Sequence, residues 1–84
     1  MEKFVSLLME APEGQLDPKM KTYIEKWSDP PTAVQLLEVL DHCIHGGLAS
    51  GMVIALLQGY YRSTLDNEKT THEEVVKNAT WRSL

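Results

Sequence analysis

Residues 48–61 read LASGMVIALLQGYY and contain no Asp, Glu, Lys or Arg. An uncharged stretch of this length predicts a helix that packs against other helices. Winding at 100° per residue places the large side chains on one broad face, which we expect to line the core. That face comprises Met52, Val53, Leu56, Leu57, Tyr60 and Tyr61. A narrow strip of small residues runs beside it at intervals of four: Gly51, Ala55 and Gly59.

The length and composition of the chain indicate one small globular domain. Its 84 residues leave room for one core, and 43% hydrophobic with 24% charged residues argues against intrinsic disorder. We therefore treat residues 1–84 as a single helical domain.

The first two helices are expected within the first 30 residues of the chain. The first covers about residues 2–10, with apolar side chains at helical spacing, and residues 12–14 read PEG and end it. The second starts at the N-cap Asp17, followed by Pro18 at the first helical position. Their expected core residues are Phe4, Leu7, Leu8 and Ala11 in the first helix, and Met20, Tyr23, Ile24 and Trp27 in the second.

A third helix should begin after Thr32, because Thr32 and Gln35 form a capping box. The pair Gly46 and Gly47 should end it, since glycine accepts the left-handed conformation of a helix C-cap. Its expected core positions are Ala33, Leu36, Leu37, Leu40, Cys43 and Ile44.

The central helix should cover about residues 49–65, with Asn67 as its left-handed cap. Thr71 and Glu74 repeat the capping box at the head of a short fifth helix. We expect this helix to be docked by Val75, Val76, Ala79 and Trp81. No segment alternates apolar and polar residues convincingly. The fold class is therefore all-α, a compact bundle of about five short helices around a central apolar helix at about 49–65.

The charge of the chain argues against nucleic-acid partners. Its formal charge is −4, and no Lys or Arg lies between Lys26 and Arg62, so no basic stripe forms on one helix. The third and fourth helices still have the outline of a helix-turn-helix. A nucleic-acid-binding regulator is accordingly kept as an alternative function.

One cluster of ligand-type side chains suggests a second alternative. Asp41, His42 and His45 lie in the last turn of the third helix, and His72 could join them from the fifth. A metal-binding protein or small enzyme could use them. The competing explanation is that imidazoles interact favourably with a helix C-terminus, where Asp41 and His45 form an ordinary i, i+4 pair.

The chain carries no nucleotide-binding or hydrolase motif, and no cofactor is expected. Cys43 is the only cysteine and falls on an apolar helix face, which is typical of an inert thiol in a reducing cytoplasm. No cleavable signal peptide is evident at the N-terminus. The uncharged stretch from Cys43 to Tyr61 is interrupted by glycines, His45 and Gln58, which argues against a membrane span.

These observations favour a non-catalytic protein–protein interaction or regulatory module whose partner is another protein or a second copy of the chain. The apolar and aromatic residues exceed what five short helices can cover, and the small strip allows close approach of another helix. The candidate partner-binding residues are Gly51, Ala55, Gln58, Gly59, Tyr61, Arg62 and Trp81.

Overall fold

The computed structural model describes residues 2–27 and 31–78, with side chains from Val5 onward. The expected core roles of Phe4, Ala79 and Trp81 therefore fall outside the described side chains. The described part of the chain contains five helices and no extended strand, so the predicted all-α bundle is confirmed. The helices are α1 (Glu2–Glu10), α2 (Pro18–Glu25), α3 (Ala33–Gly46), α4 (Gly51–Glu68) and α5 (His72–Asn78).

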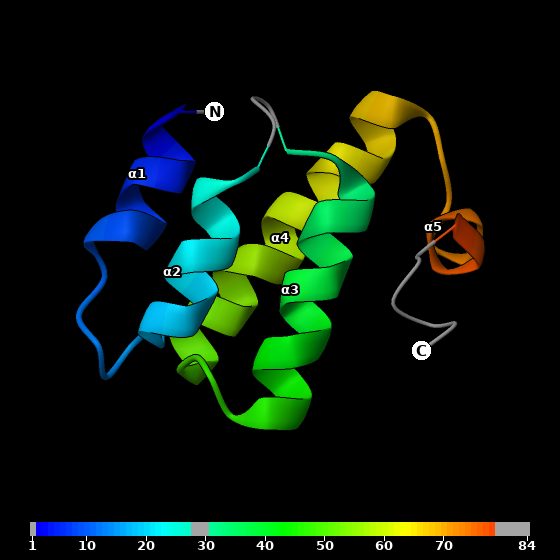
Figure 1. The fold of residues 1–84 in the computed structure, drawn as a ribbon. Coiled ribbons are helices and arrows are strands. Elements are labelled where there is room, and N and C mark those ends of the chain that lie inside the picture. The colour runs from blue at the N-terminus through cyan, green and yellow to red at the C-terminus, as the bar shows by residue number, and fades with distance from the viewer. Residues whose placement is uncertain (1, 28–30, 79–84) are drawn as a thin grey trace.

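The arrangement places α3 between three neighbours. It packs against α2, α4 and α5, and its most extensive packing is with α4. Figure 1 shows α1 and α2 at one side of this pair and α5 at the other. The α3–α4 pair thus forms the middle of the bundle.

Capping residues set the ends of α2 and α3. The Asp17 carboxylate accepts a hydrogen bond of 2.8 Å from the backbone N–H of Lys19, and Thr32 and Gln35 cap each other's backbone. Gly47 closes α3 in the left-handed conformation, with φ of 65°. These N-caps and this C-cap are as predicted, because each depends on residues within one turn of the helix end.

The predicted end of α4 is wrong. Asn67 lies inside the helix, which continues to Glu68, and Lys69 takes the left-handed cap with φ of 54°. The extra turn brings the Glu68 carboxylate to the N-terminus of α3, where it accepts a hydrogen bond of 3.0 Å from the backbone N–H of Ala33. An anion at a helix N-terminus is stabilising. This long-range contact offsets the unfavourable conformation of a non-glycine cap.

The core face of α3 overlaps the predicted face but is rotated toward Val39. Val39 is fully buried, whereas Ile44 is half exposed and Leu37 only partly buried. Ala33, Leu36, Leu40 and Cys43 are buried as expected. Because α3 has α2 as well as α4 as a neighbour, the buried stripe shifts toward the side that both helices share.

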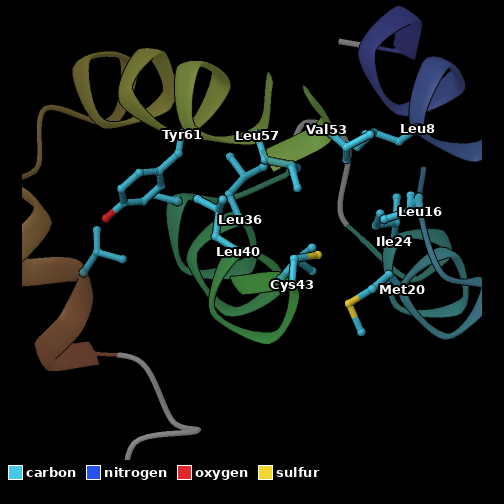
Figure 2. Close-up of a cluster of buried hydrophobic side chains, with 13 residues drawn as sticks. Leu8, Leu16, Met20, Ile24, Leu36, Leu40, Cys43, Val53, Leu57 and Tyr61 are labelled. Carbon is cyan, nitrogen blue, oxygen red and sulfur yellow. The ribbon is translucent and has the colours of Figure 1, made fainter. Parts of the chain in front are cut away.

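The core face of α4 is narrower than predicted. Val53, Leu57 and Tyr61 are buried and point toward the other core side chains in Figure 2. Met52 and Leu56 were expected in the core, but their exposed fractions are 68% and 51%. The neighbours of α4 cover one side of its large-residue face and leave the other open.

The core faces of α1 and α2 are also narrower than predicted. Leu7 and Tyr23 were expected in the core and are exposed, while Leu8, Met20 and Ile24 are buried.

A short bridge joins the α1–α2 connection to the α3–α4 turn. The backbone N–H of Asp17 donates to the carbonyl of Leu48, and that of Ser50 donates to the carbonyl of Gln15, each at 2.8 Å. Between these bonds Leu16 is fully buried. The bridge fixes α1 and α2 relative to the start of α4.

Candidate interaction surface

The small strip on α4 faces solvent. Gly51, Ala55 and Gly59 are all exposed. A methyl group built at Gly51 or at Gly59 would meet no atom of the described chain within 4 Å. Neither α1 nor α5 fills the strip in the described part of the chain. The internal packing therefore gives no reason for a glycine at position 59, in the middle of a helix.

A shallow apolar groove lies beside this strip, between α1 and α4, with a volume of about 400 Å³. Its most exposed members are Leu7 on α1 and Met52 and Leu56 on α4. Figure 2 shows Leu8 and Val53, which form its floor, extending toward one another from the two helices. We call this surface the α1–α4 groove; it is lined by Leu7, Leu8, Ala11, Pro12, Gln15, Met52, Val53 and Leu56.

The groove and the strip form one continuous face. On the helical wheel of α4, Met52 and Leu56 lie directly beside Gly51, Ala55 and Gly59. No charged side chain occurs on α4 before Arg62. The sequence-based prediction placed Met52 and Leu56 in the core, so it did not include these large side chains in the interaction surface. Their position at the edge nearest the small strip was the available signal.

The remaining predicted partner-binding residues lie elsewhere. Gln58, Tyr61 and Arg62 line a second cleft of about 430 Å³ between α3, α4 and α5. Its other lining residues are Leu37, Leu40, Asp41, Ile44, Leu65 and His72. The structure therefore divides the predicted site between two surfaces, and Trp81 falls outside the described residues.

Tyr61 serves mainly to hold α5 in place. Its hydroxyl lies 2.8 Å from Nδ1 of His72, and the two rings meet edge to face with centroids 5.8 Å apart. The tyrosine is 7% exposed, and burial raises its pKa. A neutral phenol that is hydrogen-bonded to an imidazole is a structural contact, and here it holds the short helix α5 against α4.

The residues of the candidate metal site have separate contacts. The His42 ring packs against Tyr23 of α2, with centroids 5.6 Å apart, whereas Nε2 of His45 lies 3.3 Å from the Asp41 carboxylate. Among the described residues, no three His, Cys, Asp or Glu side chains are placed to hold one metal ion. The i, i+4 pair accounts for Asp41 and His45, and the aromatic contact accounts for His42.

The Cys43 thiol is buried and has a raised pKa of about 11, because burial disfavours the thiolate. A protonated, inaccessible thiol is a poor nucleophile.

The α3–α4 pair differs from a DNA-reading arrangement. The two helices run side by side in opposite directions (Figure 1), and Arg62 is the only basic residue of α4. A recognition helix needs several polar and basic side chains on its exposed face. Separately, within the described ranges no helix combines the length and apolar character needed to cross a lipid bilayer.

Comparison with known protein families, curated proteins and solved structures found no match to this chain.

The exposed position of Gly59 gives a stability prediction. Gly59→Ala should raise the free energy of unfolding by about 0.5 to 1 kcal/mol, because alanine favours the helix and meets no neighbour. Urea unfolding followed by circular dichroism measures this change. Gly47→Ala is the matched control and should destabilise by about 1 kcal/mol, since position 47 has a positive φ. A destabilised Gly59→Ala variant would show that this side of α4 is packed.

Proposed function

We propose that this chain is a non-catalytic protein–protein interaction module that acts in the cytoplasm and binds its partner on the α1–α4 groove and the adjoining strip of α4. The observation that carries the proposal is the exposure of Leu7, Met52 and Leu56 around one groove. Contiguous exposed apolar surfaces of soluble proteins commonly mark interaction sites. Here the surface also includes three exposed small residues, and the two glycines among them have open space where a side chain would begin.

The chemistry of the remaining side chains supports a binding role. The only thiol is buried and protonated, and the Tyr61–His72 pair anchors α5. Asp41 and His45 bind each other at the surface. A binding module needs none of these groups to react, and its energy of association would come from burying Leu7, Met52 and Leu56.

Site-specific photo-crosslinking in the native host tests the proposal. A photoreactive amino acid at position 52 should give a discrete covalent adduct, because Met52 is the most exposed large side chain of the face. Mass spectrometry of the adduct then identifies the bound molecule as another protein or as a second copy of the chain. Either product supports the proposed function.

The matched control carries the same photoreactive amino acid at position 25. Glu25 is also exposed on a helix but lies outside the α1–α4 groove. Adducts should form at position 52 and be absent at position 25. Equal or absent labelling at both positions would contradict the proposal.

A further inference from the structure

The α1–α4 groove is bounded by two helices and continues onto the small strip. Among the described residues no sheet edge is free to accept an added strand, so a third helix is the natural occupant of this groove. The separation of two packed helices depends on the side chains at their contact. Gly51, Ala55 and Gly59 would let an added helix lie close to α4, with its apolar side chains inserted between Met52, Leu56 and Leu7.

The rim of the groove gives the charge of that occupant. Glu10 lies one turn after Leu7 on the solvent side of α1, and Glu13 is exposed just after Pro12. The described cation at this end is Lys21, whose ammonium group donates a hydrogen bond to the carbonyl of Ala11. The α4 side of the groove is uncharged. Among the described side chains, two carboxylates against one engaged ammonium group make the rim acidic at the C-terminal end of α1, which favours a partner with Lys or Arg there.

The same rim argues against a second copy as the occupant. A two-fold interface joins identical surfaces, so it would bring two acidic rims together. The chain as a whole also carries a net charge of −4, which opposes self-association. Charge complementarity is satisfied by a foreign basic helix and is not satisfied by this chain.

We infer that the α1–α4 groove binds an amphipathic helix of another protein, with apolar side chains at i, i+3 or i+4, and i+7, and with basic residues beside them that face Glu10 and Glu13. This inference rests on the proposed function and specifies its partner. The apolar side chains of the partner helix supply the contact area, while the acidic rim of the groove favours basic residues on that helix.

Two fluorescent peptides test the inference with the full chain. Both are alanine-rich helices of about 16 residues, long enough to form a helix, with leucines at i, i+3 and i+7. They differ only in carrying Lys or Glu beside the leucines. Fluorescence anisotropy should show that the Lys peptide binds at least tenfold more tightly than the Glu peptide, and that added salt weakens its binding.

Two sets of exposed-residue variants locate the binding. Leu56→Glu should weaken binding of the Lys peptide at least tenfold. Ile44→Glu, a change at an equally exposed residue of the other cleft, should leave it unchanged. The double variant Glu10→Lys and Glu13→Lys should reverse the preference between the peptides. Circular dichroism verifies that each variant is folded.

The possible results separate this inference from the proposed function. Equal binding of both peptides at the groove would overturn the charge assignment and leave the interaction module intact. A dimer seen by sedimentation equilibrium and abolished by Leu56→Glu would make a second copy the occupant and overturn the foreign-helix inference. A monomer that binds neither peptide would overturn the inference, and the crosslinking experiment would then decide the proposed function by itself.

Discussion

Leu57→Ala is expected to lower the free energy of unfolding by about 2 to 5 kcal/mol, because it removes a fully buried side chain from the α3–α4 contact. Leu57 points toward Leu36 and Leu40 of α3 (Figure 2), so truncation would leave a cavity between the two central helices. Urea unfolding followed by the circular dichroism signal of the helices measures the loss. For a small domain this is a large fraction of the total stability.

The adjacent leucine is the matched control for this prediction. Leu56→Ala makes the same chemical change at a side chain that is 51% exposed, and it should alter stability by less than about 1 kcal/mol. Equal losses in the two variants would mean that both leucines are buried in the folded chain, and the α1–α4 groove would then not be an open surface.

The second large effect is a loss of stability at alkaline pH. The Cys43 pKa is about 11 in the folded chain against an ordinary value of 9.0, because burial disfavours the thiolate. Between these values the folded chain holds a proton that the unfolded chain has released. This contribution is fully present below pH 9 and is lost as the pH rises through 11. It amounts to about 2 to 3 kcal/mol.

Urea unfolding at several pH values from 8 to 11 measures this dependence. Cys43→Ala should lower stability at pH 8, since it removes a buried side chain, but should make the decline toward pH 11 shallower. Burial also raises the Tyr61 pKa, so a decline of the same sign should remain in that variant. An identical pH dependence in both proteins would show that the thiol is solvated in the folded state.

Local features of this fold could be read from neighbouring residues. Asp17, Thr32 and Gly47 fix helix ends within one turn, by satisfying backbone groups that the helix leaves unpaired. The five helices and the all-α class follow from such signals together with the 3.6-residue period. They required no knowledge of which helices are neighbours.

Errors arose where a feature depended on a distant residue. The end of α4 depends on the contact between Glu68 and Ala33, which lie far apart in sequence. The burial of Val39 depends on α2, and the burial of Leu16 depends on the bridge to Ala49. A helical wheel ranks side chains by angle, but it cannot tell how wide an arc the neighbouring helices will cover.

The candidate site shows the same division within one helix. The sequence by itself determined that α4 is a long uncharged helix with a strip of Gly51, Ala55 and Gly59 beside its large residues. Only the tertiary structure decided that Val53, Leu57 and Tyr61 are buried in the core while Met52 and Leu56 are left open beside α1. The physical reason is that side-chain angle is set by the helix repeat, whereas burial is set by the position of other helices.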